Sequence, residues 1–170
     1  MPLFAHGRWV EDPWRHLADD EPLGDVASVT VSLNRLLGPE GPAVLAHPGR
    51  LGVRLATEDR VESLEPFLCR LGLIVVVFAN FADGRGFSTA RILRRRLAWR
   101  GELRAAGRIF VDQYSFLRRC GFDSFEVPDE RVASWHPDNV AIPLAYRTDS
   151  EGGVASIWRL RHNRCREPRP

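Results

Sequence analysis

A glycine-rich polar loop follows the most apolar segment of the chain and is its clearest candidate for binding a ligand. Residues 73–79 are all Leu, Ile, Val, Phe or Ala, and they lead into Asp-Gly-Arg-Gly-Phe-Ser at 83–88. Glycines let backbone amides approach a ligand, and the free N–H groups at the start of a following helix favour anions. The loop therefore predicts a site for phosphate, sulfate or a carboxylate, formed by Asp83, Gly84, Arg85, Gly86, Ser88 and Arg91.

The same residues also fit a simpler structural role. Asp-Gly is a favourable pair for a tight turn, and Arg85 has two acids with which it can form an ion pair, Asp83 and Glu102. The sequence alone leaves both interpretations open.

A second polar group follows the next expected strand. Asp112 and Gln113, with Arg108 before them, are expected to face the first loop across the carboxyl edge of a parallel sheet. Asp112 has two candidate roles: a general base, or the N-cap of a short helix over residues 114–120.

The usual signatures of cofactor, metal and triad chemistry are missing from the sequence. Gly84 and Gly86 lack the third glycine and the later acidic residue of a dinucleotide fingerprint. The three cysteines form no Cys-x-x-Cys pair, and Cys120 is expected to be a buried thiol at a helix C-terminus. None of the five histidines lies four residues from another. The sequence therefore signals no cofactor and no metal set.

Composition indicates one globular domain without a nucleic-acid or membrane partner. The chain has 170 residues, of which 44% are hydrophobic, enough for one well-buried core. All 24 basic residues are arginine, but the net charge is only +2, so no strong field attracts a polyanion. The run Arg94-Arg95-Arg96 is expected to be a solvated helix face. The longest apolar run is too short to span a bilayer and the first residues lack a signal peptide, so we expect a cytoplasmic protein.

Hydrophobic periodicity predicts the elements that position the loop. Uninterrupted apolar residues at 73–79 predict a central parallel strand covered on both faces. Helical spacing predicts a helix after residue 60, ended by Gly72, and another over 89–100 with Ser88 as its N-cap. Glycine and proline break an expected helix at 34–46. Further strands are expected at 4–10, 26–33, 51–56, 103–106 and 122–127.

This alternation of strands and helices predicts a single α/β domain over residues 1–147, with a mainly parallel sheet flanked by helices. Two arrangements satisfy it: a doubly wound sheet, which we prefer, and a half barrel of the β/α type. Residues 148–170 are polar and arginine-rich, and we expect them to form a C-terminal tail.

Several motifs together resemble one bacterial family. They are Phe-x-x-Phe-x-Asp-Gly-Arg-Gly-Phe-Ser-x-Ala-Arg at 78–91, Arg-Gly-Glu-Leu-Arg-Ala-x-Gly at 100–107, Asp-Gln at 112–113 and Arg-Cys-Gly-Phe-Asp-Ser-Phe at 119–125. Trp-Val-Glu-Asp-x-Trp at 9–14 and Leu-Gly-Val at 51–53 also fit. Over most of residues 8–146 the chain resembles the family named domain of unknown function 934.

The resemblance implies a role in assimilatory sulfite reduction, because members are commonly encoded beside sulfite reductase and labelled as oxidoreductases. Two hypotheses follow. The protein is an accessory factor that binds the reductase, its electron donor or an oxyanion, or it is an enzyme acting on a small anionic, sulfur-containing substrate at Asp83, Arg85, Asp112 and Gln113. The chain departs from the family pattern at Arg108, where members usually have Asp, and in its arginine-rich end.

Overall fold

The computed structural model describes residues 1–80 and 83–137, and in this part of the chain eight strands form one sheet. The strand order is β2-β1-β8-β7-β6-β5-β4-β3. Neighbours from β3 to β8 pair in parallel, whereas β1 pairs antiparallel with both β8 and β2. The strands are β1 (Leu3–Ala5), β2 (Arg8–Val10), β3 (Arg15–His16), β4 (Ser28–Ser32), β5 (Arg50–Leu55), β6 (Leu71–Phe78), β7 (Glu102–Gly107) and β8 (Ser124–Glu126).

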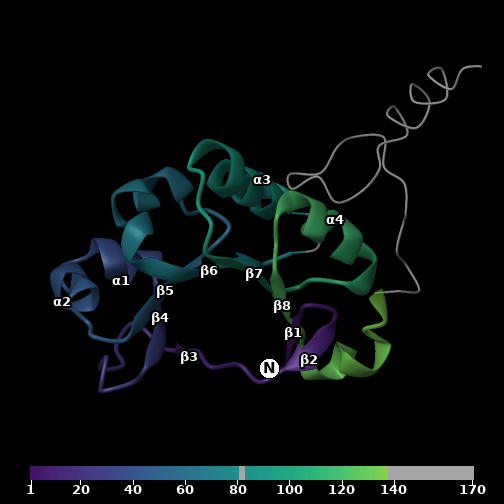
Figure 1. The fold of residues 1–170 in the computed structure, drawn as a ribbon, viewed down its shortest axis with the longest axis horizontal. Helices are drawn as coiled ribbons and strands as arrows, with labels where there is room; N and C mark the ends of the chain where they lie inside the picture. Colours follow the sequence, from purple (N-terminus) through teal and green to yellow (C-terminus); the bar gives the residue numbers. More distant parts are fainter. Residues whose placement is uncertain (81–82, 138–170) are drawn as a thin grey trace, which may run out of the picture.

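Short helices connect the parallel strands. Figure 1 shows α1 to α4 along the outer, convex side of the curved sheet. The α-helices are α1 (Leu33–Leu37), α2 (Gly41–Leu45), α3 (Arg85–Arg91) and α4 (Tyr114–Cys120). Three 3₁₀ helices and one π-helix complete the connections. The 3₁₀ helices are η1 (Val61–Arg70), η3 (Val111–Gln113) and η4 (Asp129–Ser134), and the π-helix is η2 (Ile92–Arg96).

The prediction of a mainly parallel α/β sheet is confirmed, and the arrangement is the half barrel. A doubly wound sheet reverses its strand order at a switch point and carries helices on both faces. Here β3 to β8 follow one another without reversal, and the labelled helices lie outside the curve (Figure 1). The preferred doubly wound arrangement was therefore wrong and the alternative correct.

A short connection between the two outermost strands explains the curvature. β2 and β3 lie at opposite edges of the sheet, yet only residues 11–14 join them. Eight strands in a flat sheet would place the outer strands about 34 Å apart, whereas the five steps from Val10 to Arg15 span at most about 18 Å. The sheet must therefore curl, and residues 11–16, here called the strap, cross its open side (Figure 1).

The curved sheet has two apolar layers. The main core lies between the sheet and the helices and includes Val29, Val53 and Leu103, each fully buried. A smaller cluster lies on the inner face, where Trp14 of the strap packs with Leu73, Val75 and Ala106. Trp14 is thus the apolar anchor of the strap.

Several predicted elements have different bounds. The helix expected at 34–46 is two short helices, α1 and α2, separated as its glycines and prolines predicted. Gly72 does not end the preceding helix but lies in β6. Ser88 is not an N-cap: α3 begins at Arg85, because the Asp83 carboxylate accepts a bond from the Arg85 amide and starts the helix earlier.

The basic cluster is not uniformly solvated. Arg94 is buried, and its guanidinium donates to the carbonyls of Trp99, Gly101 and Gly121 and to Asp123. These bonds join η2 to the starts of β7 and β8, so Arg94 is a structural residue.

Two other expectations concern the chain ends and membranes. In the described residues, no helix is long and apolar enough to cross a bilayer. The expected tail at 148–170 lies outside the described residues.

We predict that Trp14→Ala lowers the free energy of unfolding by about 3 kcal/mol, because it removes the buried ring that fixes the strap to the inner face. Urea denaturation measures the loss. Trp9→Ala on β2 is the matched control, since its side chain is 40% exposed and its removal should cost less than about 1 kcal/mol. Equal losses would contradict the role assigned to Trp14.

Candidate functional site

Beside the small apolar cluster around Trp14, the inner face of the half barrel carries charged and hydroxyl side chains. Side chains alternate between the two faces of a strand, so the residues flanking the buried Val29, Leu103 and Phe125 point inward. The inward residues that carry polar groups include Thr30 on β4, Arg54 on β5, Glu102 and Arg104 on β7, and Ser124 and Glu126 on β8.

Arg104 lies at the centre of this face with a side chain that is 0% exposed. Its Nη1 donates to Asp12 Oδ2 at 2.7 Å and to Glu126 Oε1 at 3.3 Å, and its Nη2 donates to Glu102 Oε1 at 3.0 Å. Burial would lower the pKa of Arg104, but the charges of Glu102 and Asp12 outweigh it and raise the pKa. The buried guanidinium therefore stays charged and holds three carboxylates around it.

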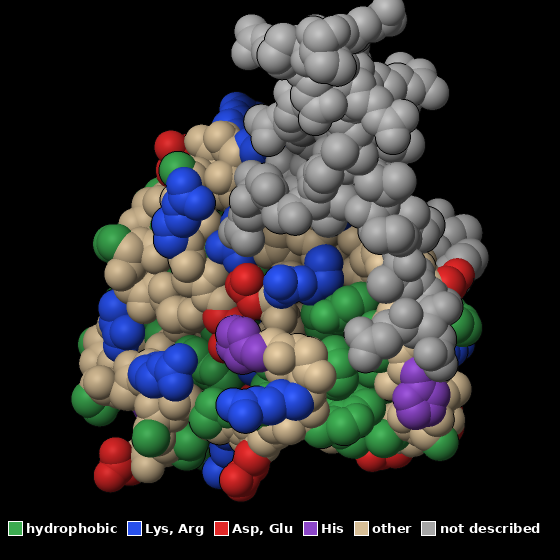
Figure 2. All heavy atoms as spheres, turned by 45° about the vertical axis from the view of Figure 1, so that its right-hand side comes forward, with side chains coloured by type: hydrophobic (Ala, Val, Ile, Leu, Met, Phe, Trp, Pro, Cys, Tyr) green, Lys and Arg blue, Asp and Glu red, His purple; other side chains and the backbone are tan. Residues whose placement is uncertain are grey.

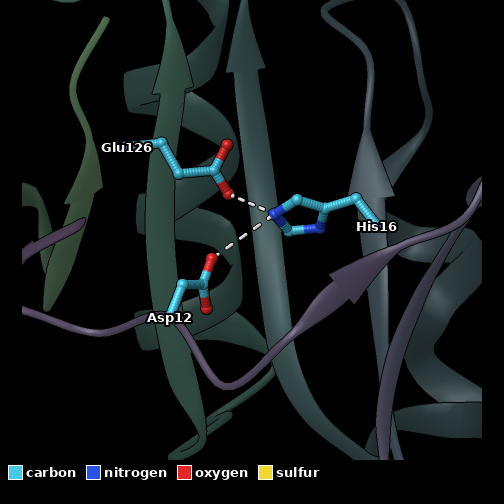
Figure 3. A group of neighbouring side chains, drawn as sticks. All are labelled: Asp12, His16 and Glu126. Carbon is cyan, nitrogen blue, oxygen red and sulfur yellow. Dashed lines mark ion pairs between the residues drawn. The ribbon is translucent and has the colours of Figure 1, made fainter. Parts of the chain in front are cut away.

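His16 brings the strap into this network (Figure 3). Its Nε2 lies 2.9 Å from Glu126 Oε1 and 3.6 Å from Asp12 Oδ2, and its Nδ1 is hydrogen-bonded to Thr30 Oγ1. Burial would lower the pKa of His16, but the bonds to Asp12 and Glu126 outweigh it and raise the pKa. The two carboxylates thus favour the protonated form of the ring.

The carboxylates respond in the opposite direction. Burial alone would raise the pKa of Asp12, but the bonds from His16 and Arg104 lower it to about 2. Burial alone would also raise the pKa of Glu126. The bond from His16 and the charges of Arg54 and Arg104 outweigh this effect and lower the pKa. We call Asp12, His16, Arg54, Glu102, Arg104 and Glu126 the charge cluster. Its three acids balance its three bases when His16 is protonated.

Asp12, His16 and Glu126 have the donor types of a divalent-metal site, and their ligand atoms lie within 4.8 Å of one another. The carboxylates are already engaged, however. Arg104 donates to Asp12 Oδ2 and Glu126 Oε1, and Arg54 donates to both oxygens of Glu126. Two fixed guanidinium charges at these oxygens oppose a metal dication, so the arrangement fits a proton on His16 better.

His16 and Arg54 are more exposed than the acids beside them, whereas elsewhere in the cluster Arg104 is 0% exposed and Glu102 is 29% exposed. The side chains of His16 and Arg54 are 31% and 26% exposed, against 3% for Glu126 and 19% for Asp12. Within the described residues, Arg54 donates only through Nη1, which leaves its Nε and Nη2 without a protein acceptor. A ligand that approaches this side therefore meets positive charge and free N–H groups.

A cavity of about 380 Å³ lies beside the cluster, at the amino ends of β7 and β8. The strap and the β1–β2 hairpin form its other walls. It is lined by Leu3, Ala5, His6, Val10, Glu11, Pro13, Arg100, Gly101, Glu102, Arg104, Asp123 and Ser124. We call it the amino-edge pocket.

In the glycine-rich loop, Arg85 forms a two-pronged ion pair with Asp83, one of the two partners expected for it. The anion site at this loop stays a prediction. Gly86 is buried against the Phe78 ring. Because a Cβ at this position would lie 2.6 Å from the ring, the glycine allows α3 to pack on β6. Gly84 has open space around it and precedes the seven residues of α3.

The other predicted site residues make separate local contacts. Gln113 Oε1 accepts a bond from the Phe110 amide, and Asp112 lies in η3, the turn that leads into α4. Ser88 is exposed on α3, and Arg91 lies beside the Cys120 thiol. Among the described residues, no hydrogen bond or ion pair joins Asp112 or Gln113 to the loop at 83–88.

Cys120 is buried at the end of α4, as predicted. Burial raises the pKa of its thiol, although Arg91 and Arg119 act in the opposite direction. A neutral buried thiol is a poor nucleophile, so Cys120 is a packing residue.

Sequence reasoning missed the whole charge cluster. Two signals were present: Asp12 and His16 are four residues apart on the strap, and Glu102 and Arg104 alternate with apolar residues along β7. The second signal marks a strand with one polar face, which in the middle of a sheet predicts buried charges that pair with one another.

The pattern of the family described as "Bacterial protein of unknown function (DUF934)" matches residues 52–153. The chain belongs to this family. Neither a curated protein nor a solved structure matches it. The DUF934 match includes Arg54, Glu102, Arg104 and Glu126, whereas the strap lies before its first residue.

Surface charge in this DUF934 protein is mixed. Figure 2 shows arginines spread over one face with acidic side chains and a histidine among them, and no continuous basic block. Any attraction of an anion must therefore come from a local group such as the charge cluster.

We predict that the stability of this DUF934 protein falls as the pH rises from about 6 to about 9, a range in which the carboxylates stay ionised. The raised pKa of His16 means that its stabilising contribution is complete below its unfolded value of 6.5 and is lost as the pH rises through the folded value. Urea denaturation across this range should show a flatter profile for His16→Gln. Exposed His136→Gln is the control and should follow the wild type; parallel profiles for all three proteins would rule out the imidazolium.

Proposed function

We propose that this protein is a cytoplasmic accessory factor in assimilatory sulfite reduction, and that it binds a small oxyanion at Arg54, beside His16. The metabolic role comes from the family resemblance. The anion site is supported by one observation: His16 and Arg54 are both more exposed than Glu126, the buried carboxylate with which they pair.

The position of Arg54 supports a ligand site. It is the penultimate residue of β5, and Glu126 is the last residue of β8. Both lie toward the carboxyl edge of the parallel strands, where β/α barrels bind their ligands. Glu126 fixes Arg54 through Nη1, so the other N–H groups are held in place without being used.

The chemistry suits a trigonal oxyanion such as sulfite. A planar guanidinium can donate two parallel bonds to two oxygens of one anion. His16 contributes positive charge rather than a donor, because both of its ring nitrogens already have partners in Thr30 and Glu126. Loss of that charge at high pH should weaken binding.

The accessory role defines the partners that we propose. A factor that holds sulfite without reducing it must deliver the anion to sulfite reductase or act with the electron donor of that enzyme. The charge cluster supports this role over an oxidoreductase role because each of its groups is engaged in an ion pair, as expected of a binding site with fixed charges.

We expect isothermal titration calorimetry to detect sulfite binding that Arg54→Gln weakens at least about tenfold. Glu126 retains Arg104 and His16 as partners in that variant, so the fold should survive. Arg85→Gln is the matched control, an exposed arginine paired with Asp83, and it should bind sulfite like the wild type. Loss of binding in Arg85→Gln alone would move the site to the glycine-rich loop, and equal binding by all three proteins would refute the site at Arg54.

A genetic experiment tests the metabolic role. Deletion of the gene should impair growth on sulfate or sulfite but not on cysteine, and a plasmid carrying Arg85→Gln should restore growth where Arg54→Gln does not. Normal growth of the deletion strain on sulfite would overturn the assignment to sulfite reduction.

A further inference from the structure

The amino-edge pocket is lined by neither Arg54 nor His16 and is not part of the proposed oxyanion site. Its floor is formed by Glu102 and Ser124 at the first positions of β7 and β8. Its volume of about 380 Å³ is within the range of small-molecule sites.

The pocket is lined by one cation and one carboxylate whose bonding groups are not all used by described residues. Arg100 and Glu102 are two residues apart and both line the cavity. Arg100 is exposed and makes no ion pair within the described residues. Glu102 Oε1 accepts from Arg104 and Ser124, while Oε2 accepts from no described residue. Opposite charges two positions apart in the chain are therefore available to one ligand.

The opposite wall is apolar. Leu3 and Ala5 of β1 are buried, and Val10 of β2 is the register partner of Leu3. All three line the cavity. A ligand that pairs with Arg100 and Glu102 can thus place a nonpolar group against the hairpin.

We propose that the amino-edge pocket binds a free α-amino acid. Its carboxylate would pair with Arg100, its ammonium with Glu102 and the nearby Glu11, and its side chain would pack on the apolar wall. A simple oxyanion fits less well, because the three acids Glu11, Glu102 and Asp123 also line this cavity. A nucleotide fits poorly for the same reason.

The test is a calorimetric titration of the full chain with each of the twenty standard L-amino acids. Propylamine carries only the ammonium group and propionate only the carboxylate. The two compounds therefore test whether binding needs both groups in one molecule. At least one amino acid should bind to the protein. Propylamine and propionate should each bind to the protein at least about tenfold more weakly than that amino acid. Binding of propylamine as tightly as the best amino acid would overturn the proposal, as would the absence of binding by any amino acid.

Two variants assign the binding to this pocket. Arg100→Gln changes an exposed side chain and should weaken amino-acid binding at least about tenfold, whereas Arg95→Gln, an exposed arginine outside the pocket, should leave it unchanged. Arg54→Gln should also leave it unchanged, so failure of this inference and failure of the oxyanion site are distinguishable. Unchanged binding in Arg100→Gln would refute the pocket as the site.

Discussion

The structure depends on the short connection between β2 and β3. Because those strands occupy the two edges of the sheet, the strap can join them only if the sheet curls. Curvature in turn creates an enclosed inner face, and the strap then places Asp12 and His16 opposite side chains from β5, β7 and β8. The charge cluster is therefore a product of closure, and no single strand or helix contains it.

The inner face shows why the cluster must form as a unit. A guanidinium as completely buried as that of Arg104 is tolerable only when its charge is compensated nearby, and it has three carboxylates within hydrogen-bonding distance. Each carboxylate is in turn shared with another group. Such networks contribute little net stability relative to an apolar core, but they strongly disfavour alternative pairings. The cluster thus specifies the position of the strap more than it strengthens the fold.

Sequence reasoning succeeded where the signal was local. The uniform apolar run of β6 and the helix over 114–120 were both predicted. It failed where distant residues meet. Asp12 and Arg104 are 92 residues apart, and the sequence around one gives no sign that it contacts the other. Gly86 is a different case, because a glycine required by the Phe78 ring and a glycine that admits a ligand look the same in a sequence. Strand order was also left open, because it depends on which distant strands pair with one another.

The antiparallel pairing of β1 with β8 has a consequence for how the chain reaches this structure. Leu3 lies near one end of the described residues, and its register partner Glu126 lies near the other. Contacts of such long sequence separation form slowly, because loop closure must precede them. We therefore expect the hairpin to pair with β8 only after the more local pairings of the sheet have formed. In this order of events, the β1–β8 pairing completes the sheet.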